Sequence, residues 1–413
     1  MRVHLAYGRS GAVVEVPDQA QVILPTQLPA LADERVAVHD AVAPRLDGLV
    51  DGATRVVVVF PDLTRPMPNR TVLPPLLGAL AARGVPDAHV TLLCATGTHR
   101  QATLAEMEEL IGADLLARYR VVDHSASSDE HVPVGAVDGV PIRLQREYVE
   151  ADVRIITGFV EPHFFAGFSG GPKAVCPGLA ALETILEAHH PRRIADPRAT
   201  FVTRLGNPVH DFVRAAVALA PPHLSVDVTI NRERAVTAVF AGPLTETHDA
   251  ACAFAESSAV QRVPAAFDVV VSTNGGHPLD RNLYQAVKGM AAAERIVVDG
   301  GDIVMAAMCG DGVPDDGAFA RLVAGARDAG DLLHASGGPE LDVWQAQVLG
   351  RVLQRADVHL FSDGLSDAST RRALLHPVTD LTGAVQDAVA RHGAAARVAV
   401  LPEGPLTVAT VLP

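Results

Sequence analysis

The sequence predicts an α/β protein made of two α/β domains, with mainly parallel sheets and a ligand-binding crevice between the domains. Strand and helix patterns alternate along the chain, as they do in proteins with parallel sheets. A length of 413 residues suits two domains. We place an N-terminal domain at residues 1–260, to which a C-terminal segment at 395–413 returns, and a second domain at residues 265–392.

The N-terminal domain begins with a strand, a Gly-Arg-Ser-Gly turn and a second strand. Three later runs rich in β-branched residues predict buried strands, each followed by a loop and a helix. Thr103 is the expected N-cap of the second of these helices, and Gly84 and Gly112 end the first two. The strands are predicted at 54–60, 89–95 and 153–157, and the helices end near 83, 112 and 188.

The second domain follows a connecting helix that is predicted over residues 244–264. Its first strand leads through an Asn-Gly-Gly-His-Pro turn into a helix and another strand. These three elements are predicted at 267–272, 280–293 and 295–305, and further helices run to about residue 391. The end of the chain, from residue 397, has a strand-like pattern, and we expect it to return to the N-terminal domain.

Composition limits the class of function. The chain is 48% apolar with a formal net charge of −14 and has no basic run, which argues against nucleic acid as a partner. Its 4 cysteines are scattered and predict reduced, buried thiols. We find no signal-peptide pattern and no apolar run that approaches the ~20 residues of a membrane span. The expected protein is cytoplasmic, without a membrane partner, and a homo-oligomer is compatible with the sequence.

Only two of the 34 basic residues are lysines, Lys173 and Lys288, and the rest are arginines. Arginine can replace lysine as a solvated surface charge, but it cannot act as a compact point charge or as an amine nucleophile. Codon bias with two accidental remnants is the alternative explanation. Because both lysines lie in motif-like surroundings, we interpret them as functional.

Three polar clusters follow the carboxyl ends of predicted strands, where open α/β sheets bind ligands. Asp62 and Arg65 lie on one proline-rich loop. Arg65 could bind a carboxylate or a phosphate, or the two residues could simply form an ion pair within the loop. His99 lies in a small-residue loop and is a candidate general acid/base, the alternative being a loop that leads into a helix. His163 follows the third strand, and we expect all three loops to converge.

The strongest local signal is the stretch from Glu161 to Lys173, which contains Ser169, Gly170 and Gly171. Glycines let the backbone approach a ligand, and successive N–H groups can hold an anion. Nearby phenylalanines would supply an apolar wall that lowers the pKa of Lys173 and makes its amine nucleophilic. The stretch is not a phosphate-binding P-loop, because a proline precedes the lysine. A simple glycine-rich turn would leave Lys173 unexplained.

Two further groups are weaker signals. The pair His189-His190 ends a predicted helix. Either histidine could be a metal ligand, or the helix dipole could favour histidine at this end of the helix. Taken by itself, the pair is better explained by the helix dipole. Tyr284, Gln285 and Lys288 lie on or near one face of a predicted helix and suggest a substrate-binding surface. The alternative is an ordinary solvated helix face.

Taken together, these motifs resemble the nickel-dependent lactate racemase family, whose members racemise or epimerise 2-hydroxy acids. The resemblance covers most of the chain, and its glycine-lysine motif is highly specific. The matching motifs, in order, are Asp62-x-Thr-Arg65-Pro, Gly97-Thr-His99-Arg100, Glu161-Pro-His163-x-x-Ala-Gly-x-Ser-Gly-Gly-x-Lys173, Glu183-Thr-Ile-Leu followed by His189, Gly206-Asn-Pro-Val-His210, and Tyr284-Gln285-x-x-Lys288.

The resemblance implies an isomerase that uses reversible, proton-coupled hydride transfer to a nickel-pincer nucleotide, a covalently attached pyridinium bisthiocarboxylate mononucleotide. The N-terminal domain would bind this cofactor, the second domain would face the substrate, and the cofactor would lie in the crevice between them. The implied partners are a small 2-hydroxy acid and the enzymes that make the cofactor.

The resemblance also implies a role for each site residue. His99 and His163 would be the catalytic acid/bases, one for each face of the substrate. His189 would ligate nickel; His190 is the alternative, although spacing from the Glu183 motif and Pro191 favours His189. The implied cofactor-binding residues are Lys173, as the attachment point, with Gly170, Gly171, Ser169, Asp62 and Thr64, and the implied substrate-binding residues are Arg65, Tyr284, Gln285 and Lys288.

Two other functions remain compatible with the residues alone. A lyase or aldolase could form a Schiff base through Lys173, with His163 as the base. A non-enzymatic protein of two α/β domains could close on a carboxylate without metal and without turnover.

Overall fold

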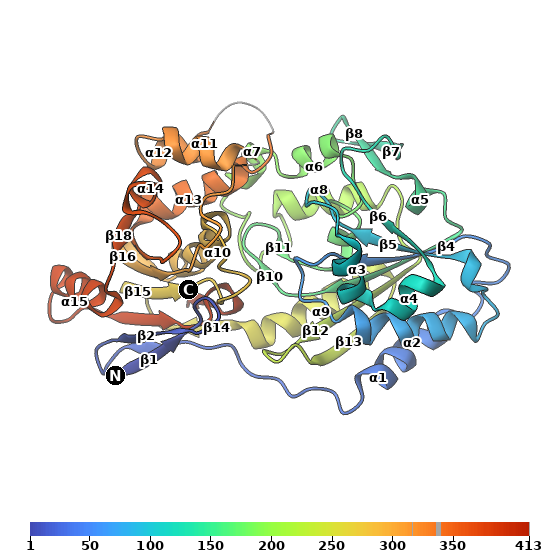
Figure 1. Cartoon of the computed structure of the whole chain (residues 1–413), viewed down its shortest axis with the longest axis horizontal. Helices are drawn as coiled ribbons and strands as arrows, with labels where there is room; N and C mark the ends of the chain where they lie inside the picture. The colour runs from blue at the N-terminus through green and yellow to red at the C-terminus, as the bar shows by residue number, and fades with distance from the viewer. Residues whose placement is uncertain (316, 336–339, 413) are drawn as a thin grey trace. The chain divides into compact units, whose positions relative to one another are not determined.

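The computed structural model describes residues 1–315, 317–335 and 340–412, which form two compact α/β units (Figure 1). We name each unit after its lysine. The Lys173 unit comprises Gln27–Ala188 and Arg198–Ser257. The Lys288 unit comprises Met1–Thr26, His189–Pro197 and Ser258–Pro413.

The Lys173 unit is built on a six-stranded sheet in which only the edge strand β13 is antiparallel to its neighbour. Both faces of strand β4 are buried, which explains its unbroken run of β-branched residues. Val56 and Val58 pack into one apolar cluster, and Val57 and Val59 pack into another. The order across the sheet is β13 (Val236–Gly242), β12 (Leu224–Ile230), β9 (Val153–Phe159), β4 (Val56–Pro61), β5 (Val90–Ala95) and β6 (Arg120–Asp123).

Helices cover both faces of this sheet: α1 and α2 contribute to the first apolar cluster, and α6 and α8 to the second. The predicted start and stop signals of α3 are confirmed, since Thr103 and Glu106 form a capping box and Gly112 ends the helix. The helices are α1 (Glu34–Val42), α2 (Asn69–Ala81), α3 (Leu104–Ile111), α4 (Ala113–Arg118), α5 (Arg146–Val149), α6 (Leu182–Ala188), α8 (Pro208–Val217) and α9 (Leu244–Ala259). Two hairpins complete the unit, β7 (His131–Val137) with β8 (Val140–Gln145), and β10 (Pro162–His163) with β11 (Gly167–Phe168).

The Lys288 unit has its own six-stranded sheet, and every strand pair in it is parallel. The order is β18 (His376–Val378), β17 (Ala356–Phe361), β16 (Val297–Ala306), β15 (Phe267–Thr273), β19 (Val398–Leu401) and β3 (Gln21–Val22). Its helices are α7 (Pro191–Ile194), α10 (Leu283–Glu294), α11 (Ala318–Gly325), α12 (Ala329–Leu333), α13 (Val343–Arg355), α14 (Asp367–Arg372) and α15 (Leu381–His392). The hairpin β1 (Arg2–Leu5) and β2 (Ala12–Glu15) and the pair β14 (Val260–Val263) and β20 (Val408–Val411) complete it.

The prediction of an α/β chain with mainly parallel sheets is confirmed. The prediction that the C-terminal segment returns to the N-terminal domain is wrong. Strand β19 lies between β15 and β3 in the Lys288 sheet, and β20 pairs with β14. The first 26 residues also belong to the Lys288 unit. A strand pattern shows that a segment needs a partner strand, but it does not show which sheet provides one. A crevice between the domains stays a prediction.

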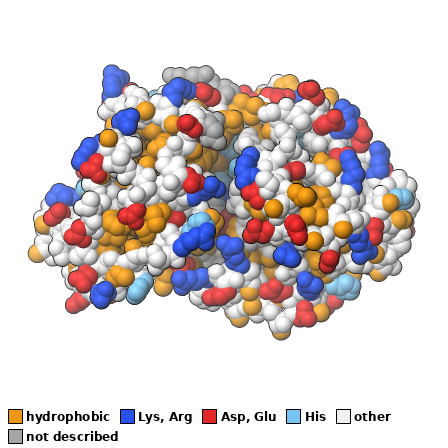
Figure 2. All heavy atoms as spheres, in the orientation of Figure 1, with side chains coloured by type: hydrophobic (Ala, Val, Ile, Leu, Met, Phe, Trp, Pro, Cys, Tyr) orange, Lys and Arg blue, Asp and Glu red, His pale blue; other side chains and the backbone are white. Residues whose placement is uncertain are grey.

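The structure bears on three expectations from the composition: the state of the cysteines, the distribution of surface charge and the presence of membrane-spanning helices. All four cysteines are free and buried. Basic and acidic side chains are interspersed on the face shown in Figure 2. Among the described residues, we find no helix that is both long and apolar enough to cross a membrane.

A buried carboxylate fastens α15 to the sheet of the Lys288 unit. Asp302 on β16 accepts hydrogen bonds from His359 on β17 (2.6 Å) and from Arg391 (2.7 Å) and His392 (2.8 Å) at the end of α15. Burial alone would raise the pKa of Asp302, but hydrogen bonds from His359, Arg391 and His392 hold this pKa well below its usual value.

We expect Asp302→Asn to lower the free energy of unfolding by about 1–3 kcal/mol at pH 7, because a buried charged acceptor with three donors is lost. A depressed carboxyl pKa stabilises the folded state above the unfolded pKa, about 3.9, and this stabilisation is lost as the pH falls below it. The difference between the two proteins in urea unfolding should therefore shrink below about pH 4. Asp299→Asn is the control, because Asp299 is 90% exposed in its pair with Arg355. Equal losses in both variants would contradict this role of Asp302.

Candidate active site

Three predicted site residues lie at the carboxyl edge of three adjacent parallel strands. Asp62 directly follows β4, His99 follows β5, and His163 follows β9, and β4 pairs with both β5 and β9. The predicted convergence of the three loops at one sheet edge is thus confirmed for the Lys173 unit. A further contact ties the His99 loop to the end of the Lys173 loop, since the Gly97 N–H donates to the Gly178 carbonyl at 3.0 Å.

Asp62 and His99 form a hydrogen-bonded dyad. His99 Nδ1 donates to Asp62 Oδ2 at 2.8 Å, and the Thr64 hydroxyl donates to Asp62 Oδ1 at 2.8 Å. Burial alone would raise the pKa of Asp62, but the hydrogen bond and charge of His99, the charge of Arg65 and the hydrogen bond from Thr64 lower it. The His99 side chain is 46% exposed, whereas that of Asp62 is 10% exposed. An ionised, buried carboxylate therefore orients an accessible imidazole.

His163 lies in an aromatic wall. Its ring centre is 4.9 Å from that of Phe164 and 4.6 Å from that of Phe165. Its Nδ1 accepts the backbone N–H groups of Phe165 (3.5 Å) and Ala166 (3.3 Å), which fixes the ring in the tight β10–β11 hairpin. Lys173 is half-buried, and its Nζ lies 5.6 Å from the centre of the Phe165 ring. Phe165 thus connects the predicted acid/base and the predicted attachment residue.

A buried carboxylate from a distant strand holds the glycine turn before Lys173. Asp227 on β12 accepts the Gly171 N–H at 3.0 Å, so this donor of the expected anion cradle is engaged within the protein. A Cβ on Gly158 would meet Asp227 Oδ1, and a Cβ on Gly170 would lie 2.6 Å from Val160 Cγ2. The glycines are therefore required where the turn packs against β9 and β12.

His248 on α9 supports the same turn, because its Nε2 donates to the Ser169 carbonyl at 3.0 Å. The Ser169 hydroxyl donates to the Phe159 carbonyl (3.1 Å) and accepts the Glu161 N–H (3.1 Å), which closes the loop on itself. Burial raises the pKa of Asp227 and lowers the pKa of His248. Sequence analysis missed both residues, although an Asp in the apolar strand Leu-Ser-Val-Asp-Val-Thr-Ile was a usable signal.

The Lys288 unit carries the predicted substrate-binding residues on α10. Tyr284, Gln285 and Lys288 are half-buried, while the opposite side of the helix, including Leu283 and Val287, is fully buried. Asn282 caps the helix by accepting the Gln285 N–H at 3.0 Å. The predicted helix thus begins at Leu283 rather than at residue 280, and its predicted surface is the side that is not packed into the core.

His189 and His190 have different environments. His190 is the N-cap of α7, where its Nδ1 accepts the Arg192 N–H at 3.2 Å. His189 is buried in the Lys288 unit, with its ring centre 4.8 Å from that of Trp344. The assignment of His189 rather than His190 as the nickel ligand stays a prediction.

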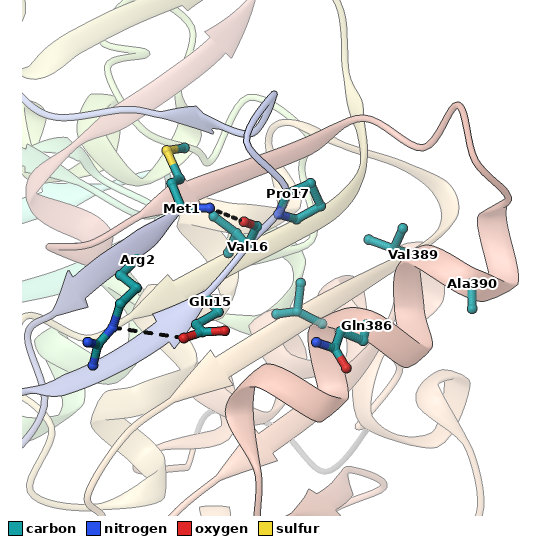
Figure 3. Close-up of a pocket in the computed structure, with 9 residues that line it drawn as sticks. Met1, Arg2, Glu15, Val16, Pro17, Gln386, Val389 and Ala390 are labelled. Atoms are coloured by element: carbon teal, nitrogen blue, oxygen red, sulfur yellow. Dashed lines mark hydrogen bonds and ion pairs between the residues drawn. The ribbon is translucent and has the colours of Figure 1, made fainter.

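A cavity in the Lys288 unit has no part in this site. Its volume is about 580 Å³. Figure 3 shows its lining residues on the β1–β2 hairpin and on α15. One ion pair lies at its edge, between Arg2 and Glu15 at 3.9 Å. The described residues that line it are Met1, Arg2, Glu15, Val16, Pro17, Val385, Gln386, Val389 and Ala390, and none is a predicted site residue.

Comparisons with known proteins agree with this geometry. The N-terminal domain of lactate racemase matches residues 7–201, and the C-terminal domain of lactate racemase matches residues 260–409. The lactate racemase of Thermoanaerobacterium thermosaccharolyticum is 33% identical over 97% of both chains. That of Lactiplantibacillus plantarum is 35% identical over 87% of this chain and 86% of its own.

Solved structures give the same result. The lactate racemase apoprotein from T. thermosaccharolyticum matches with a TM-score of 0.92 and 31% identity, over 99% of this chain and 100% of its own. A Thermotoga maritima protein with a TM-score of 0.70 and 18% identity, over 94% of this chain and 100% of its own, supports the fold alone. Because both domains match and relatives at 33% and 35% identity span most of the chain, it belongs to the lactate racemase family.

Proposed function

We propose that this isomerase racemises or epimerises a 2-hydroxy acid with a nickel-pincer nucleotide bound through Lys173. The observation that carries the proposal is the pair of differently oriented histidines, His99 and His163, at one sheet edge beside the Lys173 loop. Two positioned acid/bases suit a reaction that must move a proton at either face of a substrate carbon centre. The two bacterial relatives are named lactate racemases, which supports a small 2-hydroxy acid as the substrate.

The donor chemistry of the chain fits the cofactor that the family implies. Lys173 supplies a primary amine beside an aromatic ring, and His189 supplies an imidazole. When bound, the nickel-pincer nucleotide would supply reversible hydride acceptance at the substrate carbon. No group of three or more His, Cys, Asp or Glu side chains in the described residues could hold a metal ion, so nickel would depend on ligands from the nucleotide.

His99 is oriented as a base. Its Nδ1–H donates to the ionised Asp62, so the neutral ring carries its proton on Nδ1 and presents a bare Nε2. In the proposed reaction, this nitrogen takes the hydroxyl proton of the substrate. The resulting imidazolium is stabilised by Asp62, which remains charged because its pKa is depressed.

His163 is oriented as an acid. Because its Nδ1 accepts two backbone N–H groups, the neutral ring carries its proton on Nε2. In the proposed reaction, this N–H would hydrogen-bond to the oxygen of the planar 2-oxo acid on the other face. His163 can transfer a proton to that oxygen only from its imidazolium form, because a neutral ring that lost this hydrogen would become an imidazolate. In their neutral states the two rings thus differ, because His99 presents an acceptor nitrogen and His163 presents a donor nitrogen, and one complete reaction uses one histidine at each face of the substrate.

Charge and exclusion of water complete the proposed roles of the chain. Arg65 lies close enough to Asp62 to lower its pKa and would pair with the substrate carboxylate. Phe164 and Phe165 are buried around His163 and would keep water from the reacting groups. Tyr284, Gln285 and Lys288 are proposed to contact the rest of the substrate from the half-buried side of α10.

The proposal is tested with protein coexpressed with the enzymes that make the cofactor. Enantiopure lactate and a larger 2-hydroxy acid are incubated separately with loaded and unloaded protein, and the enantiomers are separated by chiral chromatography. We expect interconversion of at least one substrate by the loaded protein only. Loaded protein without interconversion would contradict the proposal, and a borohydride-trapped substrate adduct at Lys173 of unloaded protein would indicate a Schiff-base lyase instead.

A further inference from the structure

The first turn of α13 contacts both the predicted nickel ligand and the predicted substrate helix. Its first residues include Trp344, which is the only tryptophan of the chain and is 6% exposed. Sequence analysis attached no role to this residue, and the reaction proposed above does not use it. All of its partners discussed below belong to the Lys288 unit.

Trp344 fixes the direction of the Tyr284 hydroxyl. The indole Nε1–H donates to the Tyr284 oxygen at 3.0 Å. An indole N–H can only donate, so the Tyr284 oxygen is the acceptor and its own hydrogen points away from Trp344. Gln345 Nε2 donates to the Tyr284 carbonyl, and Phe319 packs edge-on against the Tyr284 ring with centres 5.5 Å apart. The side chain is thus held at its hydroxyl, ring and backbone.

The same turn of α13 holds the His189 segment. The Trp344 ring lies against the His189 ring, with centres 4.8 Å apart and planes inclined by 38°. One helical turn later, Gln347 Nε2 donates to the carbonyls of Pro191 (3.3 Å) and Leu333 (3.2 Å). The residues around His189 are therefore fixed by ring packing and by a hydrogen bond to the backbone two residues away.

We propose that Trp344 is a positioning residue that aligns His189 with nickel and commits the Tyr284 hydroxyl to donate toward the substrate. The inference rests on the proposed function, because it takes the roles of His189 and Tyr284 from it. It predicts that the two contacts of Trp344 have separable effects. Ring packing governs how well nickel is retained, and the indole N–H governs substrate turnover.

The experiment compares Trp344→Phe, Trp344→Leu, Tyr284→Phe and the double variant Trp344→Phe with Tyr284→Phe, all coexpressed with the cofactor-making enzymes. Phenylalanine keeps an aromatic ring against His189 and removes the N–H, whereas leucine removes both contacts. Tyr7→Phe is the matched control, because it removes a buried tyrosine hydrogen bond, to Asp363 at 2.7 Å, elsewhere in the same unit. Adduct mass, nickel per protein after dialysis, thermal unfolding, kcat and KM are measured for each.

We expect Trp344→Phe to retain nickel within about twofold of the wild type and to lose about 3- to 10-fold in kcat/KM, as loss of one hydrogen bond would produce. Tyr284→Phe should lose a similar factor, and the double variant should lose no more than the larger single loss. Trp344→Leu should in addition release at least half of its nickel during dialysis while the adduct mass remains. Tyr7→Phe should change thermal unfolding only.

The emission of Trp344 gives a reading that does not require turnover. Nickel held by the adjacent His189 should quench this single tryptophan, so loaded wild-type protein should emit less than unloaded protein. Equal emission, nickel retention by Trp344→Leu equal to that of the wild type, or multiplied losses in the double variant would each overturn the inference. A wild-type protein that carries adduct and nickel but turns over no 2-hydroxy acid would instead contradict the proposed function, while the nickel and emission results would still test the alignment of His189.

Discussion

Lys173→Arg should yield a folded protein that carries no covalent cofactor and does not interconvert enantiomers. The side chain is half-buried, with Nζ 5.6 Å from the centre of the Phe165 ring. Arginine keeps the positive charge and can keep this cation–π contact, but its guanidinium has no usable amine nucleophile. Intact mass should lack the adduct in the variant after coexpression with the cofactor-making enzymes, while thermal unfolding should resemble that of unloaded wild type.

Lys288→Arg is the matched control, because it makes the same change at the other lysine of the chain. We expect it to keep the full adduct mass and to lose activity through misplaced substrate contacts on α10. The two variants thus separate attachment from substrate binding. Normal adduct mass with normal activity in Lys173→Arg would contradict the attachment role, and loss of the adduct in both variants would indicate a general defect in loading.

The sequence was most informative where local patterns determine local structure. The buried run of β4 and the capping signals of α3 predicted both elements to within two residues. Parallel strands share a carboxyl edge, so the positions of Asp62, His99 and His163 after their strands predicted that the loops meet. The rarity of lysine singled out Lys173 and Lys288 through composition alone, and their functional roles stay predictions.

Long-range pairing could not be predicted in this way. Asp227 reaches the glycine turn only because β12 pairs with β9, and no local pattern specifies that pairing. The same holds for β19, whose pattern fits any open sheet edge, and for Trp344, whose two partners lie 60 and 155 residues away in the sequence. The tautomers of His99 and His163 also follow from hydrogen bonds that residue spacing does not reveal.

The largest effects on turnover are expected at the two histidines. His99→Ala and His163→Ala should each reduce racemisation in both directions by about 10²–10⁴-fold, the usual cost of removing a positioned acid/base. Both directions fall together because each complete reaction uses one histidine as the base and the other as the acid. The adduct mass should be unchanged. Thermal unfolding should resemble that of the wild type, so that the lower activity cannot be attributed to unfolded protein.

His223→Ala is the matched control for His163→Ala. His223 Nδ1 also accepts a backbone N–H, that of Arg154 at 2.9 Å, but it lies at the opposite edge of the sheet, beside the start of β9. A histidine with a purely structural role should therefore behave like His223, with activity that falls only in proportion to the folded fraction. If His99→Ala and His163→Ala, folded and loaded, interconvert enantiomers at near wild-type rates, the assignment of two acid/bases is wrong.

Asp62→Asn tests the orientation of His99 separately from its presence. The asparagine amide would donate to His99 Nδ1 where the carboxylate now accepts, so the ring proton would move to Nε2 and the base would be lost. We expect the variant to keep its adduct and to approach His99→Ala in the rate of interconversion. Trace 2-oxo acid should then no longer form from the enantiomer whose hydroxyl His99 deprotonates. Equal traces from both enantiomers, or a variant without adduct, would instead assign Asp62 to cofactor binding.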